Sequence, residues 1–157
     1  MISLETIEFR TVRQEDDAEF LAYQRLFWDL PLSQNPYFEQ RTDQFVESWA
    51  HSARERETPD NTFSGIALHG EKIVGLHILR FYEEHEGPAA HIAGLWVHPD
   101  YRRIGIARKL KVDGEAWARR LGAEFLNTNV MPDNAAMLRL NEAEGFRVFR
   151  LNMRKDL

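Results

Sequence analysis

The stretch Leu95–Ala107, Leu-Trp-Val-His-Pro-Asp-Tyr-Arg-Arg-Ile-Gly-Ile-Ala, decides how this chain can fold. Its first three residues are apolar and typical of a strand, and Pro99 with Asp100 favours a turn directly afterwards. The pattern Arg-x-x-Gly-x-Ala follows and leads into a segment with helical periodicity. The stretch therefore predicts a strand, a tight turn and the start of a helix in immediate succession.

A helix that begins at this turn offers a binding site for an anion. The first backbone N–H groups of a helix have no partner within it, and the helix dipole adds about half a positive charge there. Gly105 has no Cβ and Ala107 carries only a methyl group, so a bulky anion can approach the backbone. Basic residues accompany the turn in a chain of net charge −5: Arg102, Arg103, Arg108, Lys109 and Lys111. Two readings stay open, a site for a specific polyanion and an ordinary helix start with a solvated basic face.

Composition narrows the class of protein. The chain has 157 residues, of which 43% are hydrophobic and 29% charged, and this predicts one domain over 1–157. The absence of cysteine excludes disulfides and thiolate metal sites, and the six histidines show no metal-ligand spacing, so no metal is expected. With no signal peptide and no apolar run of membrane-spanning length, we expect a cytoplasmic protein without a membrane partner. The net negative charge argues against nucleic acid as the main partner.

Hydrophobic periodicity divides the rest of the chain into strands and helices. Strands are expected at Leu4–Val12, Phe63–Leu68, Lys72–Tyr82, Ala89–Val97, Glu124–Val130 and Phe146–Met153. Helices are expected at Glu15–Leu30, Asp43–Glu57, Gly105–Leu121 and Asp133–Glu144. The order βααβββαβαβ predicts an α/β (α+β) fold, a mixed sheet with helices on its faces. Ligands of such sheets bind near the carboxyl ends of strands, where Leu95–Ala107 lies.

With this order of elements, three motifs make the chain resemble the GNAT superfamily of N-acetyltransferases. The segment Arg102–Ala107 resembles the family's Arg/Gln-x-x-Gly-x-Gly/Ala. Asn134-Ala-Ala-Met resembles the family's Asn-x-x-Ala, with Met137 where Ala is usual, and Gly145-Phe146 follows at the expected distance. The resemblance covers roughly residues 62–157. It implies a GNAT-like mixed, mostly antiparallel central sheet of six to seven strands flanked by about four helices.

The resemblance implies acetyl-CoA, or another acyl-CoA, as a co-substrate. The strand end would bind the pantetheine arm through its backbone, and the amides of the turn would hold the pyrophosphate. The residues implied in binding are Leu95, Trp96, Val97, Arg102, Arg103, Ile104, Gly105, Ile106, Ala107, Arg108 and Asn134. Asn134 can equally be the N-cap of the helix that follows it, and it can do both.

The sequence departs from the family at both positions that transfer protons. Seven residues after Asn134 the family often has a Tyr that protonates the departing sulfur, but here Asn141 stands there, and an amide does not readily give up a proton. The family often places a Glu base on the strand Ala89–Val97. Here His91 is the candidate base, with an ordinary strand histidine as the alternative. Three acids just before that strand could act through water or form a solvated loop: Glu83, Glu84 and Glu86.

Two functions from different classes follow from the resemblance. The first is an N-acetyltransferase that acts on a primary amine of an unidentified small-molecule or peptide acceptor by direct attack on the thioester. The second is a non-catalytic or weakly active acyl-CoA-binding module or sensor. Trp28, Tyr37 and Phe38 are candidates for lining an acceptor site, whereas Phe27 is expected in the core. Twelve residues follow Gly145, which leaves room for one good strand or two very short ones. Part of the acceptor site is then either open or completed by another subunit, and the second alternative makes a homodimer a hypothesis.

Overall fold

The computed structural model describes residues 2–157, whose five strands form one sheet in the order β1-β2-β3-β4-β5. The strands are β1 (Glu8–Thr11), β2 (Thr62–His69), β3 (Lys72–Glu84), β4 (Gly87–Val97) and β5 (Phe125–Thr128). The helices are α1 (Asp17–Asp29), α2 (Asp43–Arg56), α3 (Ile106–Arg120) and α4 (Ala135–Ala143), with 3-10 turns η1 (Leu4–Thr6), η2 (Leu30–Ser33) and η3 (Pro99–Tyr101). Strands β1 to β4 pair antiparallel, and β5 pairs with β4 in parallel. The mixed, mostly antiparallel sheet is therefore confirmed.

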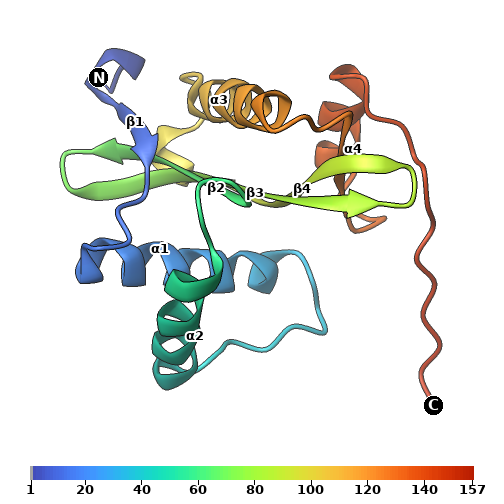
Figure 1. Ribbon diagram of the computed structural model, residues 1–157, viewed down its shortest axis with the longest axis horizontal. Coiled ribbons are helices and arrows are strands. Elements are labelled where there is room, and N and C mark those ends of the chain that lie inside the picture. The colour runs from blue at the N-terminus through green and yellow to red at the C-terminus, as the bar shows by residue number, and fades with distance from the viewer. Residues whose placement is uncertain (1) are drawn as a thin grey trace.

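Helices cover both faces of the sheet (Figure 1). Helix α3 lies on one face against β2, β3 and β4, and α1 lies on the opposite face, packed against α2. Helix α4 lies at the end of the sheet away from β1, and the chain then runs past the β3–β4 hairpin to the C-terminus (Figure 1). The two faces of the sheet therefore pack against different helices. One half of the site described below begins at α3, and the other half lies at α1 and α2.

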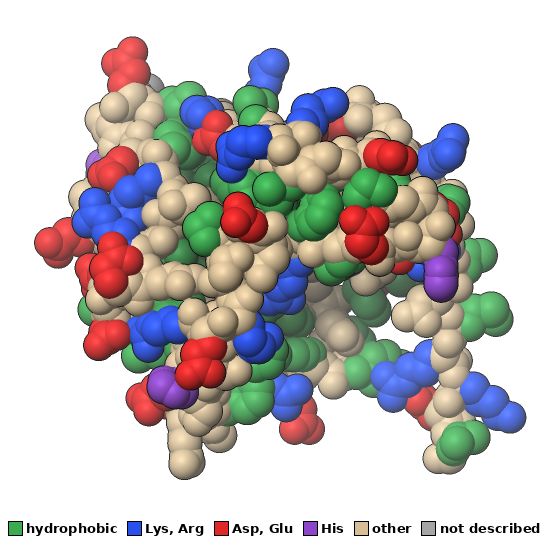
Figure 2. All heavy atoms as spheres, in the orientation of Figure 1, with side chains coloured by type: hydrophobic (Ala, Val, Ile, Leu, Met, Phe, Trp, Pro, Cys, Tyr) green, Lys and Arg blue, Asp and Glu red, His purple; other side chains and the backbone are tan. Residues whose placement is uncertain are grey.

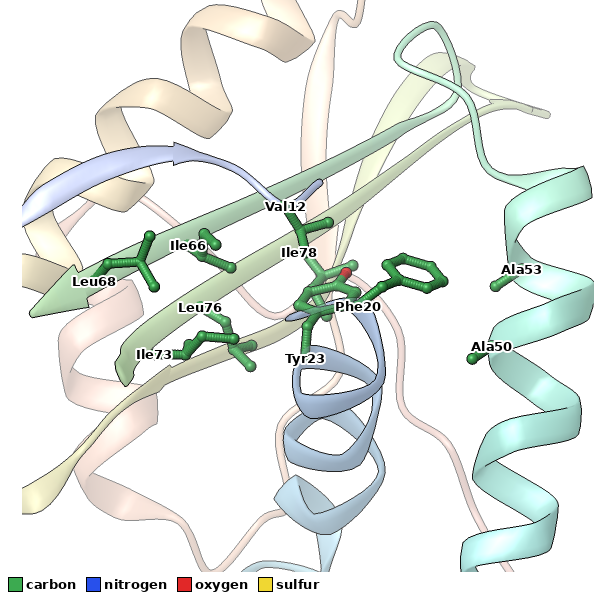
Figure 3. Close-up of a cluster of buried hydrophobic side chains, with 10 residues drawn as sticks. All are labelled: Val12, Phe20, Tyr23, Ala50, Ala53, Ile66, Leu68, Ile73, Leu76 and Ile78. Carbon is green, nitrogen blue, oxygen red and sulfur yellow. The ribbon is translucent and has the colours of Figure 1, made fainter. Parts of the chain in front are cut away.

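The larger core lies between the sheet and the pair α1–α2 (Figure 3). Both helices begin with side-chain caps, because Asp16 accepts from Glu19 N and Thr42 accepts from Phe45 N. The Tyr23 hydroxyl is buried but bonds Ser64 Oγ at 3.0 Å, so burial leaves no unpaired hydroxyl there. The core side chains are Val12, Phe20, Tyr23, Ala50, Ala53, Ile66, Leu68, Ile73, Leu76 and Ile78.

Helix α3 packs very closely on the other face of the sheet. A Cβ on Gly114 would lie 2.8 Å from Leu79 Cδ1 and 2.9 Å from His77 Cδ2, so only glycine allows this approach. Trp117, one turn further on, is buried and donates from Nε1 to Pro59 O at 2.7 Å. Gly114 is therefore a close-packing position between α3 and the sheet.

The expected strand Phe146–Met153, and with it the sheet of six to seven strands, is wrong. Within the described part of the chain, nothing after α4 pairs with the sheet. The tail instead passes the hairpin tip, where Arg150 bonds Glu86 at 2.9 Å, and Arg154 lies over the ring of Tyr37 at 4.0 Å. A β-favouring sequence forms a strand only beside an available strand edge, and these contacts hold the tail elsewhere.

Two smaller expectations are also corrected. The first strand begins at Glu8 because residues 4–6 form the turn η1. The expected acidic loop around Glu83–Pro88 is instead a tight hairpin, in which Glu84 pairs with Gly87. None of the helices described between residues 2 and 157 is both long and apolar enough to cross a lipid bilayer.

Candidate active site

Strands β4 and β5 lie side by side for only part of their length. Their parallel register runs from Ala89 with Phe125 to Ile92 with Thr128, and β4 then continues alone to Val97. Among residues 2–157, no other strand takes the place of β5 beside this part of β4. A strand edge without a neighbour presents unpaired N–H and C=O groups that can bind an extended ligand.

The ladder between β3 and β4 fixes which backbone groups face the open edge. His98 N donates to Val74 O at 2.9 Å, so these two residues form a hydrogen-bonded pair. Antiparallel ladders alternate, and the N–H and C=O groups of Leu95 and Val97 therefore point away from β3. Arg102 Nε donates to Val97 O at 3.1 Å, which places that carbonyl on the open side. The backbone of Leu95 and the N–H of Val97 remain as groups for a ligand.

Strand β4 has a β-bulge at the point where β4 and β5 separate. Ala93 has no partner on β3, because Ile78 pairs with Gly94 and the next residue of β3 pairs with Ile92. His77 Nδ1 lies 3.1 Å from Gly94 O, and burial lowers the pKa of His77 to about 4. A neutral imidazole has one N–H, and its contact with a carbonyl oxygen places that hydrogen on Nδ1. His77 therefore donates to the bulge from the α3 side, a role that sequence reasoning missed.

The turn after β4 leaves the start of α3 uncapped. Gly105 has φ +100° and offers no side-chain cap, and no side chain of residues 2–157 bonds the first N–H groups of the helix. The first backbone bond of the helix is Lys109 N to Gly105 O at 3.0 Å, so the N–H groups of 106–108 are unpaired within the helix. Arg103 also has a positive φ, 67°, which is uncommon for a residue with a side chain. Strained backbone of this kind is concentrated at ligand sites.

The basic residues of this segment do not all face the turn. Arg102, Arg103 and Arg108 are exposed there. Lys111 points inward instead: it is 7% exposed and forms an ion pair with Glu144 after α4. The expectation of one five-residue basic cluster is therefore wrong for Lys111, because the helical period turns that position toward the protein interior.

The apolar residues of the motif contribute packing from their side chains. Ile106 is buried, Ile104 packs against the same cluster, and Trp96 packs against the α1 side of the core. Ala107 is half-buried. Their contribution to an anion site can therefore come only from the backbone. The geometry leaves a row of N–H groups with three exposed arginines around it.

Asn134 lies at the start of α4 and caps it. Its Oδ1 accepts a hydrogen bond from Met137 N at 3.2 Å, so the N-cap interpretation is confirmed. The cap uses only the amide oxygen, and Nδ2 stays available as a donor. Asn141 lies on the same helix and is 9% exposed, and its backbone oxygen accepts from Phe146 N at 2.9 Å.

His91 lies on the paired part of β4. Its Nδ1 is 2.5 Å from Asn127 Oδ1 on β5, and its ring stacks on Tyr82 with centroids 6.2 Å apart. With the hydrogen on Nδ1, His91 Nε2 is left as an acceptor that can take a proton. Asn127 and Tyr82 were missed, because the sequence does not show which residues stand beside His91.

The face of the sheet that carries His91 is the α1 face. His91 pairs with Arg80, and directly paired residues point to the same face. The Arg80 guanidinium lies over the ring of Phe27 on α1 at 5.4 Å and bonds Glu57 at 3.4 Å. Leu95 lies four positions after His91, about 13 Å of extended chain, so a proton path between them would run through water.

The acidic residues before β4 lie too far from this site. Glu84 pairs with Gly87 at the hairpin tip, eight residues or about 26 Å of strand before Leu95. At the same tip, the hydrogen bond from Arg150 lowers the pKa of the exposed Glu86 carboxyl. Of the acid–base candidates, His91 is therefore the one that the structure brings nearest to the open strand edge.

The end of α1 covers the bulge from the other face. A Cβ on Gly94 would lie 3.0 Å from Leu30 Cδ1 and 3.7 Å from Phe27 Cδ2. Phe27 packs against the core, as expected. Trp28 and Phe38 stack with centroids 6.3 Å apart, whereas Tyr37 is 63% exposed. Three further residues of this aromatic region were missed because they lie further along the chain: Arg41, Phe45 and Trp49.

Metal ligands are not gathered anywhere in the described chain. Across residues 2–157, no three His, Asp or Glu side chains come together as a group that could hold a metal ion.

The fold and the site together define a mixed α/β protein with an uncapped helix start beside an open strand edge. The sequence profile of the Acetyltransferase (GNAT) family matches residues 21–146, more than half of the chain. The chain therefore belongs to the GNAT acetyltransferase family.

Individual relatives support the fold. Aminoglycoside N(6')-acetyltransferase type 1 of Acinetobacter genomosp. 13 is 39% identical over 59 residues, which are 38% of this chain and 40% of that protein. The chain thus matches about two fifths of the length of this curated relative. The structure of AAC(6')-Iy in complex with the bisubstrate analogue CoA-S-monomethyl-acetylneamine superposes with TM-score 0.72, at 16% identity over 96% of this chain and 98% of that one. A putative acetyl transferase from Pyrococcus furiosus gives TM-score 0.72, at 21% identity over 96% and 100%.

Proposed function

We propose that this chain is an N-acetyltransferase that transfers an acetyl group from acetyl-CoA to a primary amine. The observation that carries the proposal is the uncapped start of α3 at Gly105, directly after the open end of β4. The proposal treats 1–157 as a single domain that acts in the cytoplasm, with neither nucleic acid nor a membrane as partner. The named relatives support an amine acceptor, because they include aminoglycoside acetyltransferases.

The residues present fit the two ends of CoA. Free N–H groups at 106–108 and the dipole of α3 suit a pyrophosphate, with Arg103 and Arg108 exposed beside them. The unpaired backbone of Leu95 and the N–H of Val97 suit the amide groups of a pantetheine arm. Asn134 Nδ2 is a further donor, since capping occupies only the oxygen of that side chain.

Acetyl-CoA would supply the acetyl group as a thioester, in which attack by the amine forms a C–N bond and breaks the C–S bond. Leu95 N–H points to the open side of β4 and would donate to the carbonyl oxygen as negative charge develops on it. His91 Nε2 would take the proton that the amine loses, through water. The thiol has an ordinary pKa of about 8.5, so the sulfur can leave as a thiolate without an acid at Asn141.

Thiol release in the presence of acetyl-CoA and an amine panel tests the proposal. The panel pairs simple alkyl amines with amino sugars, aminoglycosides and a peptide that ends in lysine. We expect thiol release that depends on at least one amine and forms an N-acetyl product detectable by mass spectrometry. Binding of acetyl-CoA without any acetylated amine would contradict the proposal and identify an acyl-CoA-binding module.

The homodimer expected from the sequence is also a proposal, and the tail 147–157 supports it. Its apolar side chains are strongly exposed: Val148, Phe149, Leu151 and Met153. Four of its residues are cationic and one is acidic, in a chain of net charge −5, and Figure 2 shows apolar and basic side chains along the tail. The outer edge of β5 has no strand partner among the described residues, so the tail of a second copy can pair there.

Sedimentation velocity tests this dimer directly. We expect a dimer for the wild type and a monomer for L151K/M153K, because charges would remove the apolar contact. R150Q is the matched control, because it changes a tail residue without adding charge to an apolar position. A monomeric wild type, or a dimer unaffected by L151K/M153K, would contradict the tail-mediated dimer.

A further inference from the structure

An aromatic cluster joins the end of α1, the connection that follows it and the start of α2. Trp28 is its centre: the ring of Phe38 stacks on it at 6.3 Å and 17°. Phe45 and Trp49 meet the same indole edge to face, at 4.9 Å and 89° and at 5.0 Å and 85°. Trp49 also packs against the core between the sheet and the two helices, whereas Trp28, Phe38 and Phe45 are not among the side chains that pack there.

A cation occupies the middle of this cluster. The guanidinium carbon of Arg41 lies 5.1 Å from the Phe38 ring centre, 5.4 Å from that of Phe45 and 5.9 Å from that of Trp28. Within residues 2–157, no carboxylate lies within ion-pair distance of this guanidinium. Three aromatic rings around one positive charge are the arrangement with which proteins bind organic cations. We call Trp28, Phe38 and Phe45 the aromatic cage.

The side chain of Arg41 can leave the cage without moving its backbone. Arg25 Nη1 donates to Arg41 O at 2.9 Å, and Arg25 is itself held by Asp43 at 2.5 Å and Asp29 at 3.6 Å. These contacts fix the chain at 41–43 from the α1 side. Arg41 is exposed, so its guanidinium can move into water while the three rings stay in place.

Buried polar atoms without partners are concentrated in the same region. Of the four side-chain atoms among the described residues that are buried without a hydrogen bond, three are Trp28 Nε1, Trp49 Nε1 and Asp29 Oδ1, the last of which has only the ion pair with Arg25 at 3.6 Å. An unpaired buried donor or acceptor is costly, and a bound ligand can supply the missing partner. Indole N–H groups need acceptors such as hydroxyl oxygens, and a carboxylate oxygen needs a donor such as an ammonium group.

The cage also stands next to the proposed acetyl-transfer site. Phe27 and Leu30, which flank Trp28 on the chain, lie against Gly94 at the bulge of β4. The ring of Phe27 meets that of Trp28 at 5.5 Å. An acceptor whose reacting amine lies at the open edge of β4 can therefore extend another part toward the cage.

We propose that the aromatic cage binds a second cationic group of the acceptor, and that Arg41 occupies this site in the free enzyme. The acceptor is then a diamine or polyamine, with hydroxyl groups favoured by the unpaired indoles. This inference rests on the proposed N-acetyltransferase function. It adds the class of substrate, and it identifies Arg41 as a residue that competes with the substrate for the aromatic cage.

Binding of a cation that cannot react tests the cage without any catalysis. Tetramethylammonium is titrated at constant ionic strength, and binding is followed by tryptophan fluorescence. We expect R41M to bind it about fivefold more tightly than the wild type, equivalent to ~1 kcal/mol, because the competing cation is gone. R41K, which keeps a cation, should resemble the wild type. R56M is the matched control, because Arg56 lies over Trp49 alone, at 4.5 Å.

Kinetics with matched acceptors test the same site during turnover. Diamines of increasing length are compared with monoamines of the same length. We expect the diamine of best length to have a lower KM than its monoamine, and F38L to raise KM for the diamine until this advantage is lost. Y37L is the control, since Tyr37 contacts Arg154 and lies outside the cage.

The outcomes separate this inference from the proposed function. If R41M binds tetramethylammonium no more tightly than the wild type, or only lowers the midpoint of thermal unfolding, Arg41 merely covers the cluster and the inference is overturned. Equal KM values for diamines and monoamines also overturn it, although acetyl transfer itself would stand. Absence of transfer to every amine would instead overturn the proposed function, while the fluorescence titration would still report on the cage.

Discussion

The two halves of this site are built in different ways. The proposed CoA half comes from one continuous stretch, 95–108, and acts mainly through backbone N–H and C=O groups. The proposed acceptor half comes from side chains between Trp28 and Trp49, on two helices and the connection between them. A backbone-built site should tolerate most side-chain changes except those that block it, whereas a side-chain-built site should change its specificity with single substitutions.

The largest effect is expected at His91, on the α1 face of the sheet. If its Nε2 takes the proton from the amine, His91→Gln should lower kcat by ~10²–10⁴-fold with little change in the binding of acetyl-CoA. Steady-state kinetics and a separate binding titration measure the two effects. His85→Gln is the matched control, because His85 is exposed at the hairpin tip. A kcat for H91Q within about twofold of the wild type would exclude this role.

The next largest effect is expected on the free energy of unfolding and comes from His77, which donates to the bulge of β4. Its pKa is lowered from about 6.5 to about 4 by burial, so between these values the unfolded chain binds a proton that the folded protein does not. Stability from this group is therefore lost as the pH falls, by ~2 kcal/mol at pH 5 relative to pH 7.

Urea unfolding of the wild type and His77→Gln at pH 7 and pH 5 measures this contribution. The glutamine variant keeps a donor for Gly94 O but does not titrate, so its loss of stability at pH 5 should be smaller by ~2 kcal/mol. Equal losses for the two proteins would show that His77 does not stay neutral in the folded state.

A smaller effect is expected at Asn134, and it separates the two roles of this residue. Asn134→Ala removes the cap of α4 and should cost ~1 kcal/mol of stability. Asn134→Asp keeps an N-cap oxygen but loses the Nδ2 donor, so it should be as stable as the wild type and raise KM for acetyl-CoA if the amide contacts the cofactor. An unchanged KM for Asn134→Asp would limit Asn134 to capping.

Much of the fold could be predicted from the sequence because its elements have strong local signals. The expected helix Asp43–Glu57 is observed at Asp43–Arg56, and the expected strand Ala89–Val97 at Gly87–Val97. The strand expected at Phe146–Met153 failed because the contacts of Arg150 with Glu86 and of Arg154 with Tyr37 hold the tail away from the sheet. Lys111 was misplaced for a related reason, since only packing shows that its partner is Glu144.

The candidate site was predictable only where it is local. The turn at Gly105 is visible in the sequence, because a glycine at a helix start indicates a backbone conformation with positive φ, and Gly105 has φ +100°. The cage around Arg41 is not, because its rings come from positions up to seventeen residues apart and their meeting depends on how α1 and α2 pack. The contact of His77 with Gly94 likewise depends on the register of β3 against β4.

Thermal unfolding with acetyl-CoA, on the wild type, Gly105→Ala and Gly105→Glu, tests the central claim most directly. Both substitutions put a side chain at φ +100°, with room for a Cβ beside Leu4, but only glutamate adds negative charge to the helix start. At a ligand concentration of about 100 times Kd, the midpoint of the wild type and of G105A should rise by about 5–10 °C, and that of G105E should not rise. An equal rise in folded G105E, or none in the wild type, would contradict a CoA site built on the start of α3.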